Sequence, residues 1–299
     1  MKKIPAVCVI GSLNMDLTMT TKKMPKQGET VIGEHFETYP GGKGANQAVA
    51  AARLGANVTM IGAVGTDAFG DSLLKSLSQE GINVEGISKI SDVATGVASI
   101  IMSDHDNRII VASGANAFVT PELVEQYHEQ IRDSDIVLVQ LETPLEAIVR
   151  TIEIANEHSI PVIVNPAPFQ ELPEAILTGS TFLTPNEIEL EAMKQETISN
   201  SIREKIILTK GADGVQFFEN GRSKDVKSYQ VKVADTTGAG DTFNGALATQ
   251  LGSGFPLTDA VHYANAAAAL SVTKLGAQGG MPTNVEVKQF IITRQKTPS

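Results

Sequence analysis

The feature that most constrains the fold is a series of short, apolar, β-branched segments spaced along the chain. Six of them are candidate strands: AVCVIGS, VTMIGAVG, IVLVQLE, PVIVNPA, TFLTPNE and KIILTKG. Several are apolar throughout rather than alternating, which is typical of parallel strands buried on both faces. Helical segments separate them. This alternating order predicts an α/β fold: a doubly wound, mostly parallel central sheet with helices on both faces.

Local signals mark the ends of several predicted helices. Residues 43–54 and residues 70–80 are each followed by a glycine, which commonly ends a helix. Thr120-Pro121 places an N-cap residue before a proline at the first helical position. This pair predicts a helix that continues to about residue 132.

Two segments depart from the α/β pattern. Residues 14–40 and 95–113 alternate apolar and polar side chains, which predicts half-exposed antiparallel strands with hairpin turns, one of them around His105-Asp106-Asn107. A small sheet of this kind beside a large α/β unit would serve as a lid. No linker or repeat interrupts the chain. Residues 1–299 are therefore expected to form a single domain with the lid strands inserted at about 14–40 and 95–113.

Charge and composition exclude several classes of partner. The formal net charge is −10 and no basic block is present, which argues against nucleic acid or an anionic membrane as the main partner. No window approaches the roughly 18 apolar residues of a membrane helix. The single cysteine, Cys8, lies in an apolar run and fits a reducing, cytoplasmic location. The five histidines lack a metal-ligand spacing such as HExxH and are expected to be structural or surface residues.

Polar residues follow many of the predicted strands. Ligands of an open parallel sheet bind at the carboxyl ends of its strands, so we expect these residues to converge on one edge. They are Asn14, Asp16, Glu142, Asn165, Asn186, Glu189, Thr209, Gly211 and Gly214.

The segment ADTTGAGDTFNG, residues 234–245, is the most informative. It follows a predicted strand, SYQVKV, and leads into a predicted helix. The turn Gly238-Ala239-Gly240 can point its N–H groups inward, and the helix N-terminus adds about half a positive charge. Together they would stabilise charge on a transferring phosphoryl group, while Asp241 accepts a proton from the attacking hydroxyl. The alternative is that Asp241 is an ordinary helix N-cap.

A second glycine-rich segment, YPGGKGANQAVAAARLG, suggests a phosphate-binding loop. A P-loop requires GxxxxGK[ST], but the first glycine of that pattern is missing and Lys43 is followed by glycine. Lys43 and Asn46, together with Asn14 and Asp16, instead supply polar groups suited to a polyhydroxylated ligand. The alternative is that the glycines only turn the chain into a tightly packed helix.

The motifs GGKGANQA, NPAP, TPNE and DTTGAGDTFNGA resemble those of the ribokinase-like (PfkB) carbohydrate kinases. The resemblance extends from about residue 6 to 283. It implies transfer of the ATP γ-phosphoryl group to the 5-hydroxyl of D-ribose, with Mg²⁺ and K⁺ as cofactors, in a homodimer joined through the lid sheet. A related kinase for deoxyribose, fructose or a nucleoside is the alternative. The intact GAGD sequence argues against a non-catalytic sugar-binding protein.

The resemblance also assigns individual positions. Asp241 matches the catalytic base, and Gly238, Ala239 and Gly240 match the anion hole. The substrate-binding positions are Asn14, Asp16, Gly42, Lys43, Asn46, Glu142 and Asp241. The nucleotide-binding positions are Asn186, Thr209, Lys210, Gly211, Ala212, Asp213, Gly214, Gly240, Asp241 and Asn265. The potassium positions are Asp235, Thr237, Ser271, Lys274, Gly276 and Gly280, several acting through backbone carbonyls. Asn186 and Glu189 match a motif linked to magnesium.

The chain departs from the family pattern in two places. Residues 194–204, KQETISNSIRE, form a short polar segment where members of the family usually have a longer helix. Gly279-Gly280 replaces a more usual polar residue at the cation loop, although a backbone carbonyl remains available there.

Overall fold

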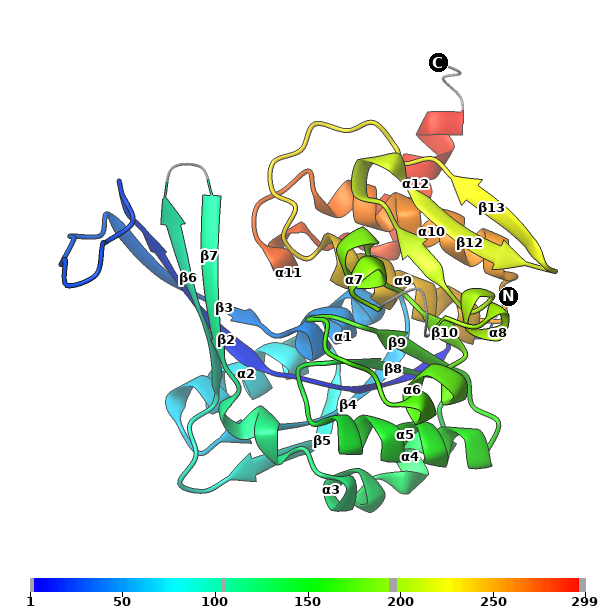
Figure 1. Ribbon diagram of the computed structural model, residues 1–299, viewed down its shortest axis with the longest axis horizontal. Helices are drawn as coiled ribbons and strands as arrows, with labels where there is room; N and C mark the ends of the chain where they lie inside the picture. Colours follow the sequence, from blue (N-terminus) through cyan, green and yellow to red (C-terminus); the bar gives the residue numbers. More distant parts are fainter. Residues whose placement is uncertain (1–2, 104–105, 194–197, 296–299) are drawn as a thin grey trace.

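A six-stranded, wholly parallel sheet forms the centre of the molecule (Figure 1). The computed structural model describes residues 3–103, 106–193 and 198–295. The strand order is β10 (Phe182–Leu183), β9 (Val162–Asn165), β8 (Ile136–Gln140), β1 (Ala6–Ile10), β4 (Asn57–Gly65) and β5 (Asn83–Ile90). The predicted α/β class is confirmed. The continuous apolar runs are explained by burial of both faces of the central strands.

Helices cover both faces of this sheet, and β1 shows how the residues divide between them. Val7 and Val9 belong to the apolar core on one face, while Cys8 and Ile10 belong to the core on the other. The first face carries α1 (Lys43–Arg53), α2 (Ala68–Gln79), α9 (Ala239–Gly252), α10 (Leu257–Ser271) and α12 (Asn284–Gln295). The second face carries α3 (Pro121–Gln126), α4 (His128–Arg132), α5 (Leu145–Glu157) and α6 (Glu174–Gly179). Cys8 is buried as expected, and burial raises the pKa of its thiol to about 12.

The predicted helix starts agree with the structure, but one predicted helix is interrupted. Thr120 caps α3 by accepting a hydrogen bond from the N–H of Leu123, as the Thr-Pro pair indicates. The helix expected to reach residue 132 breaks at Tyr127, whose hydroxyl donates to the carbonyl of Glu85 at 3.1 Å, and α4 follows. Among the described residues, no helix is both long enough and apolar enough to cross a membrane.

The two alternating segments form a separate four-stranded sheet, which stands out from the body of the molecule in Figure 1. Its order is β3 (His35–Gly41), β2 (Asn14–Thr20), β6 (Gly96–Ser103) and β7 (Asp106–Ala112). The β2–β3 and β6–β7 pairs are antiparallel as predicted, whereas the central β2–β6 pair is parallel. The wholly antiparallel expectation is therefore wrong at the junction, because the two segments leave the main sheet in the same direction. His105 of the predicted turn lies outside the described residues.

Two segments that were predicted as strands, residues 205–211 and 228–233, differ from that prediction. KIILTKG forms β11 (Ile207–Thr209), which reaches the central sheet only through isolated bridges and pairs antiparallel with β12 (Val215–Glu219). β13 (Arg222–Val226) completes this small sheet. SYQVKV, residues 228–233, is irregular and pairs with no strand among the described residues; five of its six residues line a cavity instead. The remaining helical segments are η1 (Gly114–Phe118), α7 (Glu187–Ala192), α8 (Asn200–Arg203), η3 (Gly211–Asp213) and α11 (Ala277–Gly280).

We predict that replacing Gly245 by alanine destabilises the protein, although alanine is the better helix former by about 1 kcal/mol. A Cβ at Gly245 in α9 would lie 2.6 Å from Ala50 Cβ and 2.7 Å from the Gln47 carbonyl oxygen in α1. Overpacking of this kind lowers the free energy of unfolding by about 1–3 kcal/mol. Urea titration measures the change. Gly279→Ala is the matched control, because a Cβ there meets nothing within 4 Å; equal effects of the two substitutions would contradict the prediction.

Candidate active site

Asp241 lies in the first turn of α9. The N-cap of this helix is Gly238, whose φ of 77° is left-handed. A Cβ at Gly238 would lie 2.9 Å from the Cα of Ala277, so the turn requires glycine in both conformation and space. Because α9 starts at Ala239, Asp241 is its third residue. The interpretation of Asp241 as a helix N-cap is therefore wrong.

The carboxylate of Asp241 is held by two amides from α1. Asn46 Nδ2 donates to Oδ2 at 3.1 Å, and Gln47 Nε2 donates to Oδ1 at 3.0 Å. Burial raises the pKa of Asp241, and this effect outweighs the charge of Lys43 and the two amide hydrogen bonds, which favour the ionised form. A buried carboxylate with a raised pKa is a stronger base than a free aspartate, so Asp241 is suited to accept a proton.

Gln47 is the centre of a buried amide network that the sequence did not reveal. Its Nε2 also donates to Asn165 Oδ1 at 3.0 Å, and its Oε1 accepts from Gln140 Nε2 at 2.8 Å. Both glutamines are almost completely buried. Gln47 stands beside an alanine-rich run and Gln140 ends the apolar run IVLVQ, and an amide inside such a run is the signal that could have identified them.

The network continues from Asn165 back to α9. Asn165 Nδ2 donates to the carbonyl of Thr184, the Thr184 hydroxyl donates to Asn244 Oδ1 at 2.7 Å, and Asn244 Nδ2 donates to the Gly240 carbonyl at 2.9 Å. The network therefore starts at the carboxylate of Asp241 and returns to the residue before it. Buried side chains therefore hold both the Gly240 carbonyl and the Asp241 carboxylate in the first turn of α9.

The predicted sugar-binding positions come together around the start of α1. Glu142 follows β8 and accepts hydrogen bonds from the Ser12 hydroxyl and from the backbone N–H of Lys43. Gly42 is the N-cap of α1 with φ 89°, and a Cβ there would lie 2.7 Å from the backbone nitrogen of Asn14. The glycine therefore allows the start of α1 to press directly against the start of β2.

Asp16 is the third carboxylate of this region. Burial raises the pKa of Asp16 to about 7, and the negative charges of Glu142 and Asp241 contribute to the increase. Its carboxylate lies over Gly41, where a Cβ would meet Asp16 Oδ2 at 2.4 Å. The ammonium group of Lys43 supplies positive charge close enough to act on Asp241. All seven predicted sugar-binding positions are thus neighbours, linked through contacts among β2, α1, the end of β8 and the start of α9.

A cavity of about 410 Å³ adjoins the first turn of α9. Ala239 and Gly240 line it. Six other predicted nucleotide-binding positions also line it, together with Thr236 from the turn before α9. The six are Asn186, Thr209, Gly211, Ala212, Gly214 and Asn265. Tyr229, Phe243 and Val272 give it apolar walls, a composition typical of small-molecule sites. Three predicted nucleotide-binding positions are absent from this lining: the Asp241 carboxylate is bound by α1, Lys210 forms an ion pair with Asp225 at 2.9 Å, and Asp213 is exposed.

The predicted potassium positions also converge. Asp235 Oδ1 accepts from the N–H of Thr237 at 2.9 Å, and Oδ2 accepts from the N–H of Gly276 at 2.8 Å. Burial acts to raise the pKa of Asp235, but these hydrogen bonds hold it below its usual value. A Cβ at Gly280 would lie 2.4 Å from the Ser271 carbonyl oxygen and 3.7 Å from that of Lys274. Carbonyl and carboxylate oxygens are suitable donors for an alkali cation.

Asn186 and Glu189 have a structural function that the sequence analysis did not identify. They form a capping box at the start of α7, in which Asn186 Oδ1 accepts from the Glu189 N–H and Glu189 Oε2 accepts from the Asn186 N–H, both at 2.8 Å. Burial raises the pKa of Glu189. Oxygen donors of this kind suit Mg²⁺, so a link to magnesium stays a prediction beside the observed cap.

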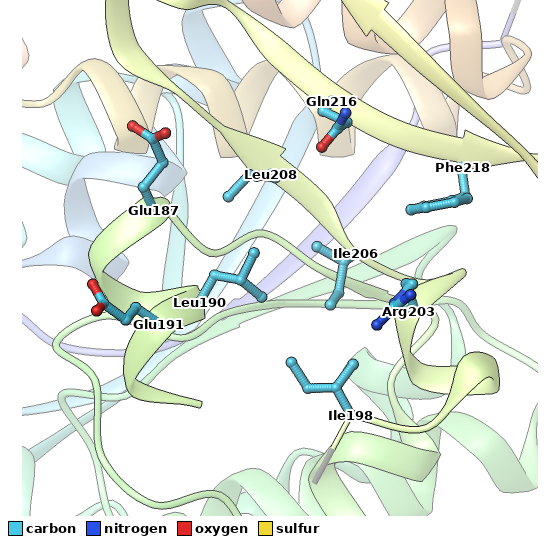
Figure 2. A pocket seen from close by; sticks show the side chains of 9 residues that line it. All are labelled: Glu187, Leu190, Glu191, Ile198, Arg203, Ile206, Leu208, Gln216 and Phe218. Atoms are coloured by element: carbon cyan, nitrogen blue, oxygen red, sulfur yellow. The ribbon is translucent and has the colours of Figure 1, made fainter. Parts of the chain in front are cut away.

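A larger cavity of about 620 Å³ lies between α7, α8 and the β11–β12 pair (Figure 2). Apolar side chains such as Leu190, Ile206 and Phe218 line it, with Glu187 and Arg203 at its edge. None of the predicted site residues belongs to its lining. The size of a cavity therefore does not identify the site in this molecule; the convergence of buried polar groups at α9 does.

Comparison with known proteins identifies the family. The sequence matches the pfkB family carbohydrate kinase over residues 5–284. The chain belongs to this family. The motifs GGKGANQA and DTTGAGDTFNGA, which frame the two sides of the site, are therefore those of a pfkB carbohydrate kinase, as the sequence resemblance indicated.

Individual pfkB relatives resemble the whole chain. Ribokinase of Bacillus subtilis is 44% identical over 289 residues, which cover 95% of this chain and 99% of the relative. Deoxyribokinase of Salmonella typhi is 34% identical over 300 residues, covering 95% and 98%. The structure of Arabidopsis thaliana ribokinase complexed with ribose and ATP superposes with a TM-score of 0.89 at 29% identity, covering 97% of this chain and 99% of that one.

We predict that Asp16→Asn stabilises the protein at pH 8 and not near pH 4. An unfolded aspartate ionises near pH 3.9, whereas Asp16 in the folded protein has a pKa of about 7. The folded state retains its proton between these values, so stability falls as pH rises through this window. Removing the buried charge should raise the free energy of unfolding at pH 8 on the order of 2–4 kcal/mol.

Urea titrations of both proteins at pH 4.5, 6 and 8 measure this effect. Asp71→Asn is the control, since Asp71 is exposed and its pairing with Lys89 on the surface contributes about 0–1 kcal/mol. A stabilisation by Asp16→Asn that is the same at all three pH values would contradict a raised pKa for Asp16.

Proposed function

We propose that the protein transfers the γ-phosphoryl group of ATP to the 5-hydroxyl of D-ribose, giving D-ribose 5-phosphate and ADP. The observation that carries this proposal is the position of the first turn of α9. Ala239 and Gly240 line the candidate nucleotide cavity, and the next residue, Asp241, is hydrogen-bonded to Asn46 among the candidate sugar residues. One helical turn thus adjoins both candidate substrate sites, as phosphoryl transfer between them requires.

Asp241 is the general base of the proposed reaction. The ribose O5 attacks the γ-phosphorus while its proton passes to the Asp241 carboxylate, and the bond from the γ-phosphorus to the ADP oxygen breaks. The backbone N–H groups of residues 238–240 and the start of α9 stabilise the charge that develops on the transferring group. Because burial raises the pKa of Asp241, activity should decline on the acid side at a higher pH than for a free aspartate.

The sugar site supplies groups of both hydrogen-bonding types. Lys43 donates, Asp16 and Glu142 accept, and the amides of Asn14 and Asn46 do both. Buried polar groups that bind a hydroxyl discriminate strongly against an analogue that lacks it. The likeness to a deoxyribokinase keeps 2-deoxyribose as the second candidate substrate, with fructose and nucleosides after it.

We also propose that Mg²⁺ and K⁺ support the reaction. Asn186 and Glu189 would hold magnesium, which would neutralise charge on the ATP phosphates. The carboxylate of Asp235 and the carbonyls of Ser271 and Lys274 would hold potassium, which would add a fixed positive charge beside the turn before α9. The close approach of Gly280 to the Ser271 carbonyl supports this assignment.

The four-stranded sheet is proposed to act as a lid and as the contact between two copies of the chain. Its strand β2 carries Asn14 and Asp16, so movement of the sheet would open or close the sugar site. Its outer strands expose large apolar side chains, among them Phe36, Ile109 and Ile110 at 59%, 53% and 70% of their areas. Exposed apolar surface of this kind is typical of association sites.

The proposed location of the protein is the cytoplasm. Its reducing conditions suit the single buried cysteine.

The central prediction concerns Asp241→Asn. Loss of the base should lower kcat by roughly 10²–10⁴. A coupled assay of ADP release with ATP, Mg²⁺ and K⁺ measures it across ribose, 2-deoxyribose, fructose and nucleosides, with Asp71→Asn as the control. Calorimetric titration with ribose separates catalysis from binding, because the variant keeps the other six predicted sugar-binding residues. Wild-type turnover in Asp241→Asn would contradict the assignment, and no turnover of any sugar or nucleoside by the wild type would contradict the proposed function.

A separate prediction concerns the cation site. Potassium in place of tetramethylammonium should raise kcat and the melting temperature of the wild type. Gly280→Ala should lose both responses while retaining its activity in tetramethylammonium, because the new Cβ lies 2.4 Å from the Ser271 carbonyl oxygen. Gly279→Ala is the neighbouring control. Full potassium activation of Gly280→Ala would show that the cation binds elsewhere.

A further inference from the structure

Two of the five histidines meet on the face of the sheet opposite α1 and α9. His128 is the first residue of α4, and His158 directly follows the last residue of α5, Glu157. Within the part of the chain that the structure describes, one ligand atom from each of these three residues lies within 4.8 Å of the other two. The cluster is separate from the candidate active site, and the proposed kinase reaction makes no use of it.

The separation of the two imidazole rings matches the spacing of neighbouring metal ligands. His128 Nε2 and His158 Nε2 are 2.9 Å apart. Metal–nitrogen bonds of about 2.0–2.1 Å place two nitrogens about 2.9 Å apart at a right angle and about 3.3 Å apart at a tetrahedral angle. The rings therefore already have the spacing of adjacent ligands in a square-planar or octahedral site, the geometries typical of Cu²⁺ and Ni²⁺.

The surroundings of His128 prepare its Nε2 atom for binding. Its Nδ1 lies 3.3 Å from Glu125 Oε1, and a carboxylate can only accept there, so Nδ1 carries the proton and the unprotonated Nε2 accepts a hydrogen bond from His158 Nε2. Glu125 is itself held by Arg150 at 2.7 Å. A carboxylate that orients a histidine through its second nitrogen is the usual arrangement around metal-bound histidines.

Glu157 and His158 are also well positioned to bind a cation. Among the described residues, the contact of Glu157 Oε1 with Arg150 is long, at 3.5 Å, which leaves the carboxylate able to turn toward the histidines. Glu157 and His158 stand at the C-terminal end of the 13-residue helix α5, where the helix dipole favours positive charge. The carboxylate of Asp133 acts electrostatically on His158 and adds to the negative potential.

We propose that His128, His158 and Glu157 form a binding site for one divalent transition-metal ion of the Cu²⁺ or Ni²⁺ type. The two Nε2 atoms and one Glu157 oxygen are its protein ligands, and water completes the coordination. His158 binds through Nε2 when its proton moves to Nδ1 through solvent, so the ring stays neutral. The bound ion links the start of α4 to the end of α5 and stabilises that face of the molecule.

Calorimetric titration of the untagged full chain with NiCl₂, at pH 7.5 in a buffer that does not chelate metals, tests the site without sugar or ATP. We expect one saturable site per chain. His128→Gln and His158→Gln should each weaken binding at least tenfold, and Glu125→Gln about 10–100-fold through loss of orientation. His262→Gln is the matched control, because His262 is exposed on α10 and lies outside the cluster.

Two further measurements make the result specific. Electron paramagnetic resonance of the Cu²⁺-loaded protein should show two coordinated nitrogens in the wild type and one in His158→Gln. Saturating Ni²⁺ should raise the melting temperature of the wild type and of His262→Gln but not of His128→Gln. Absence of saturable binding, or equal affinity in the wild type and both cluster-histidine variants, would overturn the proposal.

Discussion

The close packing of α1 against α9 is the contact on which the candidate site depends. Gly245 allows the two helix backbones to approach so closely that a single added carbon would collide with α1. At that distance Asn46 and Gln47 reach the carboxylate of Asp241, 194 or 195 residues further along the chain. The apolar cores on the two sides of the sheet fix the helices, and the helices fix the carboxylate. The geometry of the candidate site is thus a consequence of core packing.

The site concentrates negative charge in a place where water is partly excluded. Asp16, Glu142 and Asp241 act on one another, and Lys43 provides nearby positive charge. Burial and the neighbouring negative charges raise the pKa values of Asp16 and Asp241, so both side chains hold a proton more readily than a free carboxylate does. Such perturbed groups are typical of functional sites. The proposed anion hole at the start of α9 lies directly beside them, so the proposed proton acceptor and the proposed phosphoryl-binding turn fall within four residues of the chain.

Local patterns predicted the elements better than their partners. The uniformly apolar runs correctly indicated buried parallel strands, and Thr120-Pro121 correctly marked a helix start. The pairing of the strands was harder to predict, because it depends on segments that are distant in the sequence. The parallel β2–β6 junction, the antiparallel pairing of residues 207–209 and the irregular course of residues 228–233 follow from where the neighbouring segments lie. The N-cap alternative for Asp241 failed for a related reason, since a glycine could begin the helix three residues earlier.

By itself the sequence determined the α/β class, the two glycine motifs and the absence of a P-loop, because each of these depends on residue type and local spacing, and it predicted Asp241 as the base. Only the tertiary structure decided which distant groups meet. It placed Gln47 and Gln140 in the network around Asp241, left Lys210 outside the lining of the candidate nucleotide cavity, and brought together His128 and His158, which are 30 residues apart. Hydrogen bonds and metal ligands act over about 3 Å in space, and separation along the chain does not reveal that distance.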